Sequence, residues 1–279
     1  MSFWFDEVFR NICRFGVNAK ETLFSKRSEY QLVEVMDTDG FGRVLTLDGL
    51  FMTSERDEYL YHELIVHPVL TTAPAIGRVL VIGGGDGGTV REVLSYPEVQ
   101  KVVMVEIDSM VVEVSKQFLA SIGTAWDDPR LEVIIGDGLE FVKHGDTEPF
   151  DVILLDHSDP VGPAEGLFDE TFYRDCKRRL SPTGVFCLQS ESPLFQTETF
   201  MEIQTALGRC FERVHPYLGS VPIYASGAWS WTYASDRVDP LAIDEKRVSF
   251  QEQRCRKYNR DIHIGAFAIP NDIKKQMHR

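Results

Sequence analysis

The chain has 279 residues, of which 43% are hydrophobic and 26% charged, and its formal net charge is −14. This length and composition are typical of one large globular domain, or of a main domain with a smaller one attached. The negative charge argues against nucleic acids and anionic membranes as partners, and no apolar run approaches the roughly 18 residues of a membrane helix.

The 5 cysteines are scattered and include no CxxC pair, which predicts reduced thiols. The N-terminal residues lack the basic start and long apolar stretch of a secretory signal, so we expect a cytoplasmic location. The histidines show no ligand spacing, and we expect no metal site.

The first part of the chain alternates apolar and polar residues, as half-buried strands do. The expected strands are Tyr30–Val35, Gly42–Gly49 and Leu50–Thr53, with a tight turn at Asp39-Gly40. A helix is expected over Glu58–Leu70, ending before Ala73-Pro74. We therefore expect a small β-rich N-terminal domain over residues 1–72, whose exposed strands pair between copies in a homodimer or homotetramer.

From Gly77 onward, apolar strands alternate with amphipathic helices. The expected strands are Val79–Ile82, Val102–Asp108, Leu131–Ile135, Asp151–Leu155 and Gly184–Leu188, and the expected helices are Thr89–Leu94, Met110–Phe118 and Glu170–Leu180. Continuous apolar strands indicate a parallel sheet covered on both faces. The sequence therefore predicts a doubly wound, Rossmann-like α/β domain over residues 73–279.

A glycine-rich segment, Gly83–Gly88, follows the first of these strands, and Glu106 lies about 20 residues further on. The match to G-x-G-x-x-G alone fits either NAD or an adenosyl sulfonium compound. Asp86 inside the segment would repel a pyrophosphate but attract an ammonium or sulfonium group. The segment therefore favours a cationic adenosyl ligand over NAD.

Carboxylates follow four successive strands of the predicted sheet, at Asp86, Glu106, Asp137 and Asp156. Because the carboxyl ends of parallel strands meet at one edge, these acids should line a single site. Asp159 adds a second carboxylate three residues after Asp156, and such a pair suits a positively charged amine. These acids predict an amine-modifying enzyme.

Several segments together resemble the polyamine aminopropyltransferases, the family of spermidine synthase. They are Gly83–Gly88, Val105–Asp108, Gly136–Gly138, Asp156–Pro163, Leu47–Gly49, Glu55–Glu63, Pro222–Gly227 and the tail from Tyr258 to Pro270. The resemblance covers nearly the whole chain. It implies that decarboxylated S-adenosylmethionine donates its aminopropyl group to a diamine, usually putrescine, giving spermidine and methylthioadenosine. The donor is then a co-substrate, with no tightly bound cofactor.

The resemblance also implies roles for individual residues. Glu106 would bind the ribose hydroxyls, Asp137 with Gly138 the adenine, and Asp86 the donor's amino group, while Gln31 and Pro163 complete the donor pocket. Asp156 would be the catalytic base, and Tyr61, His62, Asp159 and Tyr224 would line the amine site with Asp86. Glu191 and Trp4 would reach the far end of the diamine.

Some alternatives remain open at this point. The same chemistry could act on agmatine, cadaverine or spermidine. A methyltransferase would share the α/β domain but would not need Asp86 or the Asp156–Asp159 pair, and a polyamine-sensing protein would not need Asp156. His157 stands where many relatives have a small polar residue, and it is either an outward loop side chain or part of a changed acceptor pocket.

Overall fold

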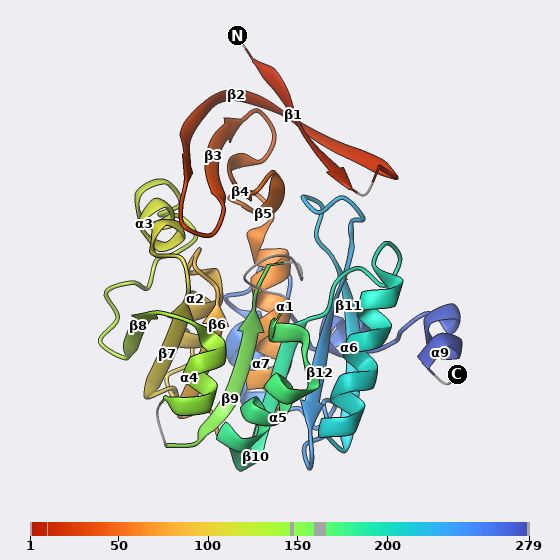
Figure 1. Cartoon of the computed structure of the whole chain (residues 1–279). Coiled ribbons are helices and arrows are strands. Elements are labelled where there is room, and N and C mark those ends of the chain that lie inside the picture. Colours follow the sequence, from red (N-terminus) through yellow and green to blue (C-terminus); the bar gives the residue numbers. More distant parts are fainter. Residues whose placement is uncertain (1, 10, 146–147, 159–165, 278–279) are drawn as a thin grey trace.

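The computed structural model describes residues 2–9, 11–145, 148–158 and 166–277. These residues form a five-stranded sheet at the N-terminal end and a seven-stranded sheet with helices on both faces (Figure 1). Among the described residues, no helix has the length and apolar character needed to cross a membrane.

The N-terminal sheet is antiparallel, with its strands in sequence order. They are β1 (Phe3–Phe9), β2 (Cys13–Arg27), β3 (Leu32–Thr38), β4 (Gly42–Leu47) and β5 (Leu50–Ser54). Strands β3 to β5 confirm the sequence prediction, whereas the alternation of residues did not predict β1 and β2. Asp48 and Gly49 join β4 to β5 with φ angles of 47° and 85°, as a two-residue hairpin turn requires.

The larger sheet has the strand order β11-β12-β10-β9-β6-β7-β8. Its strands are β6 (Arg78–Gly83), β7 (Lys101–Glu106), β8 (Leu131–Ile135), β9 (Phe150–Asp156), β10 (Leu180–Gln189), β11 (Arg213–Ser220) and β12 (Ala228–Ser235). The Rossmann-like fold is confirmed, and the five strands that the sequence predicted are parallel to one another. Strands β11 and β12 were not predicted. Strand β12 runs antiparallel to β10 and to β11. Its direction relative to β11 follows from the short loop between them, which can join only antiparallel neighbours.

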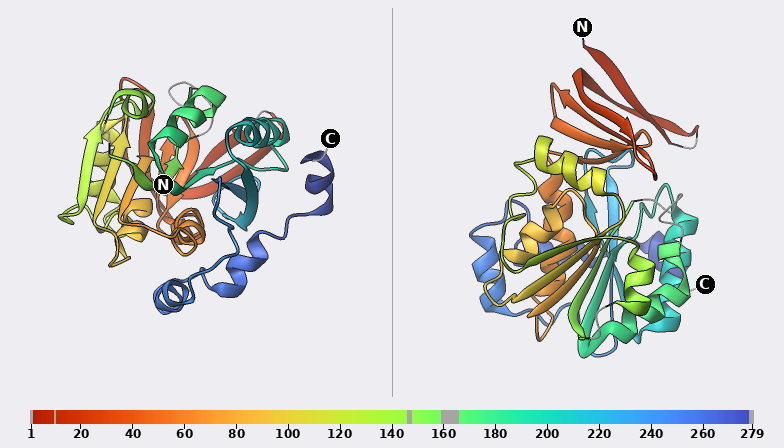
Figure 2. Two further views of the ribbon diagram at one scale, coloured as in Figure 1. Left: turned by 90° about the horizontal axis from the view of Figure 1, so that it is seen from below. Right: turned by 60° about the vertical axis from the view of Figure 1, so that its left-hand side comes forward.

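Alternate residues of the central strands face two different cores. Val79 and Val81 of β6 lie in one core, and Leu80 and Ile82 in the other. The view from below in Figure 2 shows helices on both faces of the sheet. The helices are α1 (Glu58–Leu70), α2 (Gly88–Leu94), α3 (Ser109–Phe118), α4 (Gly138–His144), α5 (Glu170–Arg179), α6 (Thr197–Cys210), α7 (Glu245–Glu252), α8 (Arg260–Ala266) and α9 (Asn271–Met277).

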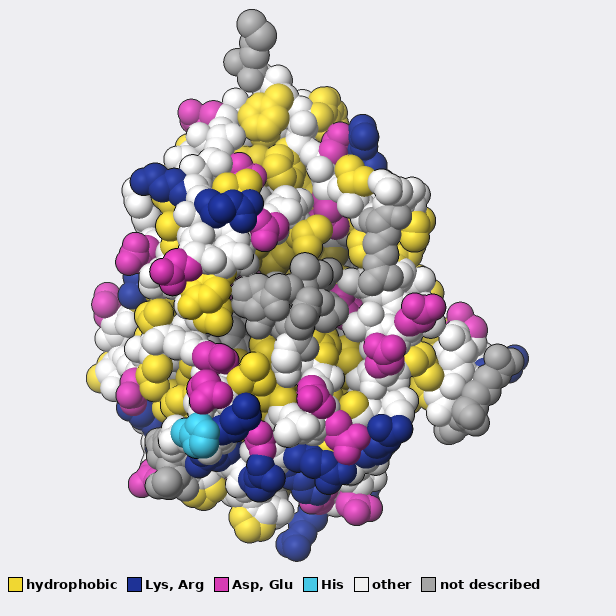
Figure 3. Space-filling model, in the orientation of Figure 1, with side chains coloured by type: hydrophobic (Ala, Val, Ile, Leu, Met, Phe, Trp, Pro, Cys, Tyr) yellow, Lys and Arg dark blue, Asp and Glu magenta, His cyan; other side chains and the backbone are white. Residues whose placement is uncertain are grey.

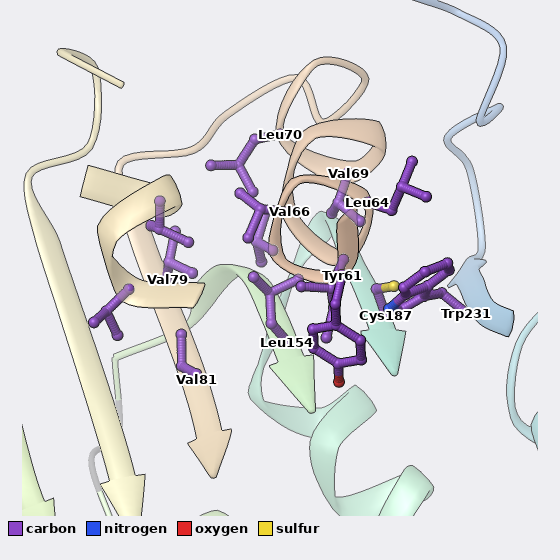
Figure 4. Packing of buried hydrophobic residues seen from close by; sticks show 14 of the residues in the cluster. Tyr61, Leu64, Val66, Val69, Leu70, Val79, Val81, Leu154, Cys187 and Trp231 are labelled. Carbon is purple, nitrogen blue, oxygen red and sulfur yellow. The ribbon is translucent and has the colours of Figure 1, made fainter. Parts of the chain in front are cut away.

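Helix α1 packs on the seven-stranded sheet, although it follows the N-terminal strands directly. Its buried side chains, including Leu64, Val66 and Val69, share a core with Val81 of β6 and Leu154 of β9 (Figure 4). Helix α1 therefore packs with the seven-stranded sheet. The boundary between two domains at residue 72 stays a prediction.

Candidate active site

The strand order of the larger sheet reverses at β6, because the chain continues to β7 on one side and β9 lies on the other. Ligands of open α/β sheets bind at such a point, beyond the carboxyl ends of the strands. Gly83 at the end of β6 is paired with Asp156 at the end of β9. A Cβ at Gly83, where φ is 82°, would lie 2.0 Å from the carbonyl oxygen of Asp156, so only glycine fits.

A cavity opens at this edge and brings together every described residue that the sequence predicted for the donor and catalytic positions. It is lined by Gln31, Tyr61, His62, Asp86, Glu106, Asp137, Gly138, Asp156 and Tyr224, among others. Asp159 and Pro163 lie outside the residues that the structure describes.

Asp156 is held by hydroxyl groups on both of its carboxylate oxygens. Tyr61 donates to Oδ1 at 2.7 Å, and Thr89 donates to Oδ2 at 2.6 Å. Burial, followed by the nearby charge of Asp86, raises the pKa of Asp156 above its ordinary value, although the two hydroxyls and His62 oppose that rise. No sequence motif indicated Thr89. The site therefore presents an oriented carboxylate with an enhanced affinity for a proton.

Asp86 is paired with a buried histidine. His62 lies 3.2 Å from Oδ2 of Asp86 through Nε2, and 2.7 Å from Oε2 of Glu58 through Nδ1. Burial opposes the charged imidazole, but Asp86 and Glu58 outweigh it and raise the pKa of His62 well above its ordinary value. His62 is therefore an imidazolium that fixes the Asp86 carboxylate. Glu58, which the sequence reasoning missed, precedes His62 by one helical turn, a spacing that could have revealed the pair.

Glu106 ends β7 and is almost completely buried at the cavity. Its Oε1 accepts the backbone N–H of Asp108 at 2.9 Å. Burial is the main cause that raises the pKa of Glu106 to about 7, and the charges of Asp108 and Asp156 add to it. In the free protein this carboxyl group is therefore half protonated near neutral pH.

Asp108 connects the loop between β2 and β3 to the part of the first cavity that is lined by Glu106. Its Oδ1 caps α3 by accepting the N–H of Met110 at 3.0 Å. Its Oδ2 accepts from Gln31 Nε2 at 3.0 Å and from Ser28 Oγ at 2.6 Å. Asp137 caps α4 in the same way, accepting the N–H of Leu139 at 2.8 Å. In the sequence, Asp108 is noted only as the last residue of the Val105–Asp108 segment. Its contact with Gln31 joins residues far apart in the chain and could not be predicted from their order.

A second cavity adjoins the first beside Tyr61. Both cavities are lined by Tyr61, His157 and Tyr224. The rings of Tyr61 and Tyr224 lie 6.0 Å apart, and the Tyr224 hydroxyl donates to the carbonyl oxygen of Met52 at 2.9 Å. Glu7, Gln189 and Gln196 line the second cavity further out. Aromatic walls with polar groups beyond suit an amine with an apolar chain.

His157 is not an outward loop side chain. Its ring packs edge-on against Phe168 with centroids 4.4 Å apart, and Nδ1 lies 2.6 Å from the carbonyl oxygen of Ser158. Burial lowers the pKa of His157 to about 4. A neutral imidazole therefore lines both cavities, which favours the interpretation as a changed acceptor pocket.

Two residues expected at the far end of the diamine do not line either cavity. Trp4 on β1 is 67% exposed. Glu191 is fully buried and accepts hydrogen bonds from Gln189 at 3.1 Å and from Gln196. Trp4 therefore faces outward in the single chain, and Glu191 lies behind Gln189 and Gln196, which line the second cavity. Contact of Trp4 and Glu191 with the diamine stays a prediction.

Comparisons with known proteins agree with this geometry. Residues 58–247 match the spermine/spermidine synthase domain, and residues 3–55 match the spermidine synthase tetramerisation domain. A polyamine aminopropyltransferase of Clostridioides difficile is 39% identical, with 99% of each chain covered, and one of a Thermoanaerobacter species is 41% identical, with 98% of each chain covered.

Solved structures show the same likeness. A spermidine synthase in complex with the transition-state analogue AdoDATO has a TM-score of 0.96 and 35% identity, covering 99% of this chain and 95% of its own. The spermidine synthase of Thermotoga maritima has a TM-score of 0.94 and 34% identity, covering 99% and 94%. The chain therefore belongs to the spermine/spermidine synthase family and is an aminopropyl-transferring enzyme.

Proposed function

We propose that the chain transfers the aminopropyl group of decarboxylated S-adenosylmethionine to putrescine, giving spermidine and methylthioadenosine. The observation that carries the proposal is the Asp156 carboxylate, which Tyr61 and Thr89 orient in the first cavity, where Tyr61 also lines the adjoining second cavity. The similar spermidine synthase solved with a transition-state analogue supports a comparable ligand here.

The donor would lie along the edge of the sheet in the first cavity. Glu106 would accept hydrogen bonds from the ribose, Asp137 and Gly138 would contact the adenine, and Gln31 would close the pocket beside them. Pro163 would complete that pocket. Asp86 would attract the donor's ammonium group. The carboxylate of ordinary S-adenosylmethionine would meet Asp86 at close range, so charge repulsion excludes the wrong donor.

The acceptor amine would enter from the second cavity, where Tyr61, Tyr224 and Asp159 would surround it beside Asp156. Its nitrogen attacks the carbon next to the sulfonium, and the carbon–sulfur bond breaks with its electron pair going to sulfur. Asp156 accepts the proton that the amine loses. The sulfonium is already a good leaving group, so direct transfer needs no aminopropyl-enzyme intermediate.

Incubation of the protein with decarboxylated S-adenosylmethionine and a panel of amines tests this proposal. We expect methylthioadenosine to form fastest with putrescine and spermidine to appear in equal amount. Absence of methylthioadenosine with every amine refutes it. A labelled aminopropyl-enzyme trapped without acceptor refutes direct transfer. Preferred turnover of cadaverine, agmatine or spermidine would assign the same chemistry to another amine.

The N-terminal sheet offers a surface for self-association, and we propose a homotetramer that uses it. Hydrophobic side chains are exposed at the top of Figure 3, where this sheet lies. The exposed large hydrophobic residues of the described N-terminal strands and their connections are Phe3, Trp4, Val8, Ile12 and Tyr30. The match of residues 3–55 to a tetramerisation domain supports this assignment. We also propose a cytoplasmic location, where the five free cysteines would stay reduced.

A further inference from the structure

Three chemically different side chains converge outside the cavities, where α1 and α2 meet the C-terminal part of the chain. They are His67 near the end of α1, Glu92 in α2 and Cys255 in the segment that follows α7. Nε2 of His67 lies 3.2 Å from Oε2 of Glu92 and 3.1 Å from Sγ of Cys255. All three ligand atoms are within 4.8 Å of one another.

These separations approach those of a tetrahedral zinc site. With Zn–S near 2.3 Å and Zn–N or Zn–O near 2.0–2.1 Å, neighbouring ligand atoms lie roughly 3.4–3.6 Å apart. The two pairs that involve His67 would need to open by only a few tenths of an ångström, and the ligand atoms of Glu92 and Cys255, which lie within 4.8 Å of each other, would need to be about 3.6 Å apart. One thiolate, one imidazole and one carboxylate suit Zn²⁺, whereas Mg²⁺ and Ca²⁺ prefer oxygen ligands alone.

The surroundings of the cluster hold its members in place. Nδ1 of His67 lies 2.9 Å from the Tyr96 hydroxyl, which can accept its proton and leave Nε2 with a free lone pair. Arg91 binds Oε1 of Glu92 at 2.7 Å through Nη2, so Oε2 faces the imidazole. Outer contacts of this kind orient the ligands of known metal sites.

The third member, Cys255, lies on a segment that is anchored to α1. Glu63 accepts the backbone N–H groups of Arg256, Lys257 and Tyr258 at 2.8, 2.7 and 2.7 Å. These three hydrogen bonds fix the backbone directly after Cys255. His67 is fully buried, but Glu92 and Cys255 are partly exposed, which leaves a path for an ion from solvent.

We propose that His67, Glu92 and Cys255 form a zinc-binding site, with a water molecule as the fourth ligand. Coordination forms a zinc–sulfur bond as the thiol proton leaves to solvent. The ion would join the C-terminal helices to α1 and α2, outside the cavity that contains Asp156. The sequence expectation of no metal site rested on ligand spacing, and these three residues are far apart in the chain.

Metal-free protein titrated with Zn²⁺ and with Co²⁺ tests the site, in the presence of saturating methylthioadenosine to occupy the main cavity. We expect one equivalent of either ion per chain, a thiolate-to-cobalt absorption band, and a higher unfolding temperature with Zn²⁺. Cys255→Ser should abolish the band and weaken Zn²⁺ binding at least about 100-fold. Cys13→Ser removes a half-buried cysteine elsewhere and should leave all three readouts unchanged.

Two results would overturn the proposal. One is the absence of stoichiometric binding to the native chain. The other is binding that survives Cys255→Ser, because the ion would then occupy different residues. Glu92→Gln provides a second variant that leaves the thiol intact, and it should weaken Zn²⁺ binding while retaining a cobalt–thiolate band.

Discussion

The buried carboxyl group of Glu106 should make nucleoside binding depend on pH. Its pKa of about 7 in the free protein reflects burial in the donor cavity. Ribose hydroxyls donate hydrogen bonds, so they prefer the ionised carboxylate and lower its pKa on binding. We therefore expect methylthioadenosine to bind with release of a proton from Glu106.

The size of the effect follows from the fraction of ionised Glu106. With a free-state pKa of about 7, roughly one tenth is ionised at pH 6 and nine tenths at pH 8. The dissociation constant should therefore fall about tenfold between these values, which corresponds to about 1.4 kcal/mol. At pH 7, about half a proton should be released for each nucleoside bound.

Calorimetry in buffers with different ionisation enthalpies measures both the dissociation constant and the number of protons released. Glu106→Gln is the control, because its neutral amide should weaken binding and remove the pH dependence. An affinity that does not change between pH 6 and 8, or a proton release that persists in the variant, would refute the assignment of Glu106 to the ribose.

The same shift has a consequence for the free protein. Because the pKa of Glu106 is raised on folding, its stabilising contribution is complete below the ordinary value of about 4.5 and is lost as the pH rises to about 7. At pH 8 the ionised group costs about 3 kcal/mol. Glu106→Gln should therefore raise the unfolding temperature at pH 8 without ligand but not at pH 4. Equal stability at both values would contradict this account.

Four further substitutions examine the rest of the site. Asp156→Asn should lower kcat about 10²–10⁴-fold by removing the base. Tyr61→Phe should move the acid limb of the pH profile of kcat/KM to higher pH, because the Tyr61 hydrogen bond lowers the pKa of Asp156. An unchanged profile in Tyr61→Phe would show that this hydrogen bond plays no part in catalysis. Asp86→Asn should reduce discrimination between decarboxylated and ordinary S-adenosylmethionine about tenfold or more in calorimetry, and unchanged relative affinities would count against it. His157→Ser should raise turnover of spermidine relative to putrescine several-fold without changing the KM for the donor. A change in the donor KM alone would show that His157 contacts the donor, and would refute its assignment to the acceptor pocket.

The central strands could be predicted because their burial on both faces requires unbroken apolar runs. Leu154 and Leu155 of β9, for example, face different cores and are both completely buried. Strands β11 and β12 lack such a signal, since polar residues such as Ser230 and Thr232 are buried through side-chain hydrogen bonds. The position of β12 between β10 and β11, antiparallel to both, depends on tertiary packing that no local pattern encodes.

Sequence alone determined which residues gather at the sheet edge, because each acid follows a strand and the strands are parallel there. The positions of the glycine segment, Glu106, Asp137 and Asp156 along the chain are therefore enough to assign them to one cavity. Only the tertiary structure decided the charge states and partners of these groups. The pairing of Asp86 with an imidazolium, the half-protonated Glu106 and the neutral His157 all depend on burial and on neighbours from other elements. Desolvation and short-range electrostatics act through space, so the order of residues along the chain cannot specify them.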